Sequence, residues 1–221
     1  MKTDSQLQKD VMAQLKWEPL LRSAEIGVSA SNGIVTLSGS VDSYAKKSEA
    51  EDAVKRVVGV KAVVEKLEIK YPSSWAKKDD NDIAAEIVRA LKWNWEIPGD
   101  KVKARVEKGW VTLDGEVEFN YQSEAAAKAV RSLVGVNGVS NNIKLKSRSE
   151  DAIETADIES ALARNWSTSE NEIRVQVSGH KATLSGTVGS WYQKDEAGRL
   201  AWNAPGVWNV ENNLAVEYTD L

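Results

Sequence analysis

Cysteine and histidine, two residue types that often act as nucleophiles, general bases or metal ligands, are almost absent from this chain of 221 residues. The chain has no cysteine, which excludes a thiolate nucleophile and a cysteine metal site. Its single histidine, His180, follows Gly179 in a predicted turn. One histidine cannot form a multi-histidine metal site, and we interpret His180 as a turn residue rather than a general base.

Two short motifs have alternative interpretations as binding sites. Asp79, Asp80 and Asp82 lie close together, but they lack the glycine and the distal glutamate of a calcium loop. We expect them to begin a helix, whose dipole favours carboxylates there. The residues from Gly135 to Gly138 match a Gly-x-x-Gly pattern that clamps nucleic acid between two helices. Here a predicted helix leads into a predicted strand, so we interpret the motif as a helix end.

Known catalytic signatures do not occur in the sequence. It has no Gly-rich phosphate loop, no Gly-x-Ser-x-Gly and no His-Glu-x-x-His. We therefore predict a protein that is not an enzyme, with no catalytic residues, no cofactor and no metal site.

Tryptophan is the one residue type present in clear excess, with nine copies. Because its ring has an apolar body and one hydrogen-bond donor, tryptophan favours protein and membrane interfaces. Two interpretations remain open: packing between repeated units, or an exposed aromatic rim that contacts lipid headgroups or a protein partner. The candidate interaction surface consists of Trp93, Trp95, Trp110, Trp166, Trp191 and Trp208.

The charge of the chain argues against some partners. The net charge is −4, and residues 148–221 alone carry 6 basic and 12 acidic side chains. An acidic surface repels phosphate, so we expect no nucleic acid partner. The sequence shows neither a signal peptide nor a long apolar span, which predicts a cytoplasmic protein, or a periplasmic one if a leader was removed.

A repeated phrase divides the chain into three units. Residues 33–39 read Gly-Ile-Val-Thr-Leu-Ser-Gly, and the phrase recurs at residues 109–115 and, altered, at residues 179–186. We predict domains at residues 1–72, 77–147 and 149–219. Their linkers are too short for long tethers, so we expect neighbouring units to touch.

Each repeat predicts the same order of elements. Apolar residues four apart, such as Val11 and Leu15, indicate a first helix, and strict alternation from Ile26 indicates a strand. A hairpin turn follows, type I′ at Asn32-Gly33 and type II′ at Gly179-His180. A second strand, an alanine-rich helix and a third strand complete the unit. The prediction is an α+β fold of three tandem α-β-β-α-β units, each a three-stranded mixed sheet with two helices on one face.

Two positions in the repeat have predicted structural roles. An aspartate precedes the closing glycine by the same distance in all three units, as Asp4, Asp80 and Asp151, and we expect it to be the N-cap of the first helix. The closing glycine, Gly39 in the first unit, lies on the inward face of its strand. We expect a helix to cross there, with a bound ligand as the alternative.

The repeated units resemble the BON domain family, a bacterial module named for an osmotically inducible periplasmic protein and nodulation proteins. The Gly-x-Val-Thr-Leu-x-Gly phrase, the leucines of the first helix, the alanine-rich second helix and the Gly-Val pairs at residues 59, 135 and 206 carry the resemblance. It extends over residues 4–217, three times over. The family has no fixed catalytic residues that could be matched to this sequence.

The resemblance implies three functions. The first is a non-enzymatic binding or scaffolding protein associated with osmotic or envelope stress. The second is peripheral binding to a phospholipid membrane surface. The third is sensing of K⁺ or another small ion, since one cytoplasmic relative responds to potassium. A phospholipid surface, a protein partner and K⁺ are the partners that we expect from it.

Overall fold

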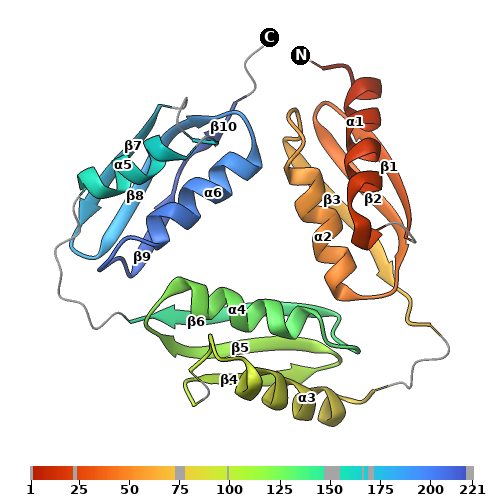
Figure 1. Cartoon of the computed structure of the whole chain (residues 1–221). Helices are drawn as coiled ribbons and strands as arrows, with labels where there is room; N and C mark the ends of the chain where they lie inside the picture. The colour runs from red at the N-terminus through yellow and green to blue at the C-terminus, as the bar shows by residue number, and fades with distance from the viewer. Residues whose placement is uncertain are drawn as a thin grey trace.

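The computed structural model describes residues 2–21, 24–72, 78–98, 100–146, 155–165, 167–168 and 172–217. These ranges form three α+β units in tandem, as the sequence predicts, each with two helices on one face of a mixed sheet (Figure 1). The elements of the first unit are α1 (Asp4–Trp17), the short helix η1 (Pro19–Leu21), β1 (Glu25–Ser31), β2 (Ile34–Val41), α2 (Tyr44–Lys55) and β3 (Ala62–Ile69).

The other two units repeat this order. The second has α3 (Asp80–Trp93), β4 (Val102–Glu107), β5 (Trp110–Val117), α4 (Asn120–Arg131) and β6 (Gly138–Leu145). The third has α5 (Thr155–Arg164), β7 (Ile173–Ser178), β8 (Lys181–Val188), α6 (Trp191–Trp202), β9 (Asn209–Asn212) and β10 (Ala215–Val216). Its last strand is divided in two, because β9 and β10 both pair with β8 and are separated by residues 213–214.

The middle strand of each sheet pairs in both directions. β2 runs antiparallel to β1 through a hairpin and parallel to β3 through the crossover that contains α2. Asn32 and Gly33 have φ angles of 52° and 82°, as a type I′ turn requires. In the third unit Gly179 has a φ of 58° and His180 has no positive φ, which fits the predicted type II′ turn.

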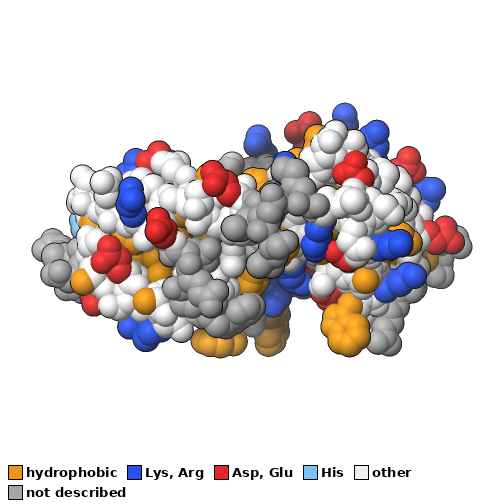
Figure 2. Space-filling model, turned by 90° about the horizontal axis from the view of Figure 1, so that it is seen from above, with side chains coloured by type: hydrophobic (Ala, Val, Ile, Leu, Met, Phe, Trp, Pro, Cys, Tyr) orange, Lys and Arg blue, Asp and Glu red, His pale blue; other side chains and the backbone are white. Residues whose placement is uncertain are grey.

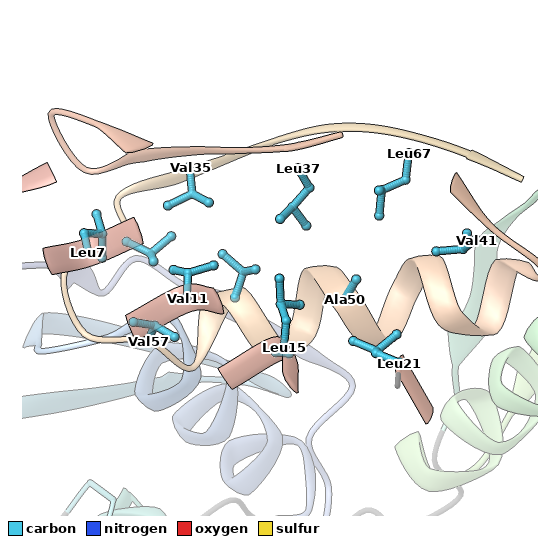
Figure 3. Close-up of a cluster of buried hydrophobic side chains, with 13 residues drawn as sticks. Leu7, Val11, Leu15, Leu21, Val35, Leu37, Val41, Ala50, Val57 and Leu67 are labelled. Atoms are coloured by element: carbon cyan, nitrogen blue, oxygen red, sulfur yellow. The ribbon is translucent and has the colours of Figure 1, made fainter. Parts of the chain in front are cut away.

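The core of each unit lies between the helices and the middle strand. Figure 3 shows Leu7, Val11 and Leu15 of α1 facing Val35 and Leu37 of β2. These five side chains are almost completely buried. Residues four apart share one face of a helix and residues two apart share one face of a strand, so the apolar residues of both elements point into the same layer. The second and third units bury equivalent sets of residues around Leu113 and Leu184.

The closing glycines allow two strands to approach closely, which corrects the expectation that a helix crosses there. Gly39 has a φ of 121° and pairs with Ile26, and a Cβ atom on it would overlap the backbone carbonyl oxygen of Glu25. Gly115 and Gly186 meet the first strands of their own units in the same way. The neighbouring backbone is therefore that of the first strand.

The repeated aspartate also differs from its predicted role. Thr3 and Asp79 are the N-caps of α1 and α3, and Asp4 and Asp80 are the first helical residues. Asp80 instead accepts hydrogen bonds from the backbone N–H groups of Lys108 and Gly109, at 2.7 and 2.9 Å. Asp4 accepts one from the N–H of Asn32 at 2.8 Å, so both carboxylates tie a hairpin turn to a helix start. Asp151 lies outside the described residues.

The three units surround a common centre toward which α2, α4 and α6 face (Figure 1). The hydroxyl of Tyr71 lies 3.0 Å from the carbonyl oxygen of Val136, joining the first and second units. Tyr44 of α2 packs against the core of the second unit. Between the first and third units, the indole Nε1 of Trp191 donates to the carbonyl oxygen of Lys61 at 3.1 Å.

Charged groups of α2 and α6 also interact between the first and third units. Lys55 pairs with Glu51 at 2.9 Å. Partial burial by itself lowers the pKa of Lys55. The hydrogen bond with Glu51 and the negative charges of Glu51, Asp52 and Asp195 raise it by more, so the pKa of Lys55 lies above its ordinary value. The pKa of Asp195 is raised, chiefly because partial burial disfavours its charged form. The negative charges of Asp52 and Glu51 raise the pKa further, and the positive charges of Lys55 and Lys194 oppose this rise. Asp195 still exposes more than a third of its surface, so its effect on stability is small.

Gly39→Ala should destabilise the first unit by about 2–4 kcal/mol, because the new methyl group meets backbone that cannot turn away and the φ is unfavourable. Urea unfolding followed by circular dichroism should show an early transition for one unit. Gly27→Ala is the control in the same sheet: its φ is ordinary and its new methyl group meets only the flexible hydroxyl of Ser38 and more distant backbone. Equal midpoints for the two variants would contradict the proposed role.

Asp195→Asn should stabilise the chain slightly at neutral pH and have no effect in acid. The folded-state pKa of Asp195 is raised, so the wild type loses stability relative to the variant as pH rises from about 4 through that pKa. Urea midpoints measured between pH 3.5 and about 7.5 test this. Glu159→Gln, an exposed change on α5 that also removes one negative charge, is the control and should not show the same pH dependence.

Candidate interaction surfaces

Exposed tryptophans mark the ends of the first helices. Trp17 ends α1 and Trp93 ends α3, and Trp95 follows two residues after Trp93. Their exposed fractions are 78%, 85% and 88%. Figure 2 shows large hydrophobic side chains protruding at its lower edge, which is the side turned toward the viewer in Figure 1. Exposure of this degree indicates side chains that are available to bind a partner.

The sequence prediction included Trp93 and Trp95 but omitted Trp17 from the candidate surface. Trp17 and Trp93 stand at the same distance before Gly39 and Gly115, which was a signal in the repeat for treating them together. The tertiary structure adds Leu20, which is 48% exposed, and Met12, which is 39% exposed, to the apolar surface near Trp17. Met12 also lines a shallow cavity between α1 and β1.

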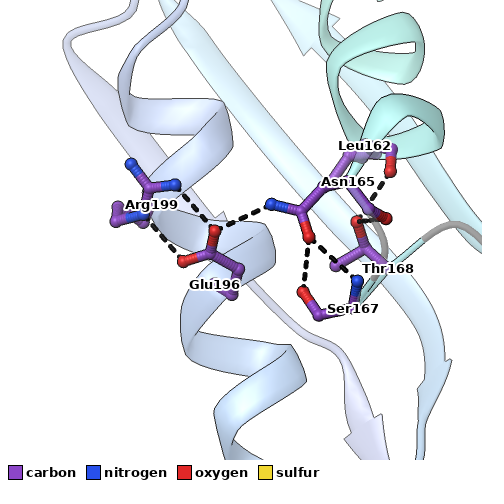
Figure 4. A network of polar contacts seen from close by, with 6 residues as sticks. All are labelled: Leu162, Asn165, Ser167, Thr168, Glu196 and Arg199. Carbon is purple, nitrogen blue, oxygen red and sulfur yellow. Dashed lines mark hydrogen bonds and ion pairs between the residues drawn. The ribbon is translucent and has the colours of Figure 1, made fainter.

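In the third unit the end of the first helix is held by polar contacts (Figure 4). The Asn165 side chain accepts from the backbone N–H and the hydroxyl of Ser167, and its amide donates to Glu196 Oε1 at 2.9 Å. The hydrogen bonds from Arg199 hold the pKa of Glu196 below its ordinary value. The candidate residue Trp166 lies outside the described residues.

Trp110 and Trp208 occupy the hairpin ends of their sheets and make structural contacts. Trp110 is half exposed, donates to the Ser140 hydroxyl at 2.9 Å, and covers Gly138 so closely that a Cβ atom there would overlap the ring. Trp208 stacks on His180 with ring centroids 3.6 Å apart and an interplanar angle of 5°. His180 Nδ1 lies 2.8 Å from the carbonyl oxygen of Gly206, so the imidazole has a defined place at this turn.

The described candidate tryptophans therefore do not form one surface. Trp93 and Trp95 are neighbours at the end of α3, whereas the start of α3 contacts the hairpin that precedes Trp110. Trp110 thus lies at the opposite end of the second unit from Trp93. Trp191 lies at the contact between the first and third units, with the Nζ of Lys194 5.4 Å from the centre of its ring.

A cavity that sequence reasoning missed lies between the second and third units. Residues 118–121, at the start of α4, and residues 202–207, at the end of α6, line a space of about 390 Å³. Its aromatic walls are Phe119, Tyr121 and Trp202. The sequence signal was local: Phe119 stands at the N-cap position that Ser43 and Ser190 occupy in the other units.

Two classes of site are not seen within the part of the chain that the structure describes. No group of three or more His, Asp or Glu side chains there is placed to hold a metal ion. In those same ranges no helix has the length and apolar character needed to cross a membrane. The closing glycines, which do recur at matched positions in all three units, have a structural role in the fold.

Comparison with known proteins agrees with the repeat. The model of the BON domain matches residues 3–71, 79–147 and 150–218. Osmotically-inducible protein Y of Escherichia coli (strain K12) is 32% identical over 146 residues, which are 65% of this chain and 73% of that protein. The C-terminal domain of CdsD, the structural protein of the type III secretion system of Chlamydia trachomatis, aligns over 98% of this chain and 100% of its own. It does so at 17% identity and a TM-score of 0.26. The matched residues confirm the resemblance inferred from the repeat, and the chain belongs to the BON domain family, with three copies of that domain.

Proposed function

We propose that this chain is a non-enzymatic binding or scaffolding protein of the osmotic stress response. The similarity to a protein named for osmotic induction supports the stress association. The observation that carries the binding role is the exposure of Trp17, Trp93 and Trp95 at or just beyond the ends of α1 and α3. Large rings held in water at equivalent helix ends are suited to docking, since each has an apolar body to bury and a donor to pair.

Cells that lack this chain should grow more slowly after an osmotic upshift, and the wild-type chain should restore growth. The triple variant Trp17→Ser, Trp93→Ser, Trp95→Ser should not restore it, because the docking rings are gone while the cores are intact. Trp110→Leu is the matched control, since it changes one half-exposed tryptophan at the opposite end of the second unit. Full rescue by the triple variant, at equal protein level, would refute docking through these rings.

A phospholipid surface is the second candidate for the docked partner. The protruding rings favour it because tryptophan settles at the boundary between headgroups and acyl chains. The net charge of −4 argues that aromatic burial, rather than attraction to anionic headgroups, would supply the affinity. Binding should therefore depend little on salt and should not require anionic lipid.

Co-sedimentation with neutral phosphatidylcholine vesicles tests this second candidate. The wild type should bind, and the triple serine variant should bind at least about a thousandfold more weakly, because each of the three rings that leave water contributes about 1.5–3 kcal/mol. Trp110→Leu should bind as the wild type does. Failure of the wild type to bind at low salt, with or without anionic lipid, would leave a protein as the docking partner.

A further inference from the structure

The cavity between the second and third units has three aromatic side chains among its ten lining residues. Phe119 and Tyr121 stack with ring centroids 5.7 Å apart and an interplanar angle of 17°. They remain 53% and 46% exposed although they lie beside the end of α6. Trp202, the last residue of α6, lines the cavity from the third unit and also packs against the core of that unit. Figure 1 shows this as the place where the green and blue units approach one another.

Phe119 lies at a helix N-cap position where the other two units have a serine. Ser43 and Ser190 accept a backbone N–H at the starts of α2 and α6, and phenylalanine cannot do so. The side-chain oxygen of Gln122 accepts from the N–H groups of Glu118 and Phe119, which precede the helix. An aromatic ring that is exposed and also occupies a cap position contributes little to folding, which points to a role in binding.

The charge of the lining favours a cation. Glu118 is its one charged residue, and its carboxylate lies 3.2 Å from Lys101 Nζ outside the cavity. The other polar groups of the lining side chains are neutral: the amides of Asn120 and Asn203, the Tyr121 hydroxyl and the Trp202 indole N–H. A lining with one carboxylate and no basic group disfavours phosphates and carboxylates, whereas aromatic faces attract positive charge.

We propose that this cavity binds a small methylated ammonium cation of the choline type. Such a cation has an apolar methyl surface that fits aromatic walls, and its diffuse charge is stabilised by the negative faces of the rings and by Glu118. Bare K⁺ is disfavoured here because it needs a shell of oxygen ligands that aromatic walls do not supply. The same headgroup occurs in phosphatidylcholine, but there a phosphate would approach Glu118, so the cavity favours the free cation.

Isothermal titration of the full chain at fixed ionic strength tests the proposal with matched probes. Choline and tetramethylammonium should bind, whereas 3,3-dimethylbutan-1-ol, the uncharged analogue of choline, and KCl should not. Glycine betaine should bind more weakly than choline, because its carboxylate approaches Glu118. Equal affinity for choline and its uncharged analogue would overturn the proposal, as would the absence of choline binding.

Two variants test whether choline binds in this cavity. The double variant Phe119→Leu, Tyr121→Leu keeps apolar volume but removes two rings, and it should weaken choline binding about tenfold. Both side chains are about half exposed, so the double variant should fold as the wild type does. Trp110→Leu, in the same unit but outside the cavity, should leave the affinity unchanged. An unchanged affinity in the double variant, or binding to phosphatidylcholine vesicles without binding of free choline, would overturn the assignment. Loss of the docking described above would leave these results unaffected.

Discussion

Close packing of two helices on the middle strand of a three-stranded sheet is the interaction on which each unit depends. The middle strand must pair with both neighbours while its inward residues, such as Val35 and Leu37, are buried beneath the helices. The pairing of β1 with β2 brings the backbone of Glu25 so close to Gly39 that no side chain fits there. The repeated glycine is therefore a consequence of backbone geometry and needs no ligand to explain it.

The three units satisfy one further constraint with different chemistry. The second helix must be held against the third strand, and one pair of matched positions does this in each unit. In the first unit Lys47 pairs with Glu65 at 2.8 Å. In the second, the Asn141 amide donates to the Ser123 hydroxyl, and in the third, Asn212 donates to the carbonyl oxygen of Lys194. The two positions in contact are the same in every unit, but the contact is an ion pair in the first unit and a hydrogen bond from an asparagine amide in the other two. The surfaces of the units can therefore differ in charge while the helix stays in place.

The candidate binding features lie where the units differ, as expected if the shared fold is a scaffold. Trp17 and Trp93 end two of the first helices, whereas the matching region of the third unit is held by the polar contacts of Asn165. Phe119 replaces a capping serine in one unit only. These substitutions leave the cores unchanged, so each can alter binding without altering the fold.

The sequence by itself determined the order of elements, the hairpin turn types and most of the core, because these depend on periods of two and 3.6 residues and on positive φ at specific turn residues. It misassigned the contacts of Asp80 and Gly39, whose partners are set by strand register and hairpin placement rather than by local propensity. Only the tertiary structure showed that Trp191 reaches Lys61 and that Phe119 faces the end of α6. Those contacts join residues far apart in the chain, and no local pattern encodes how three similar units pack against one another.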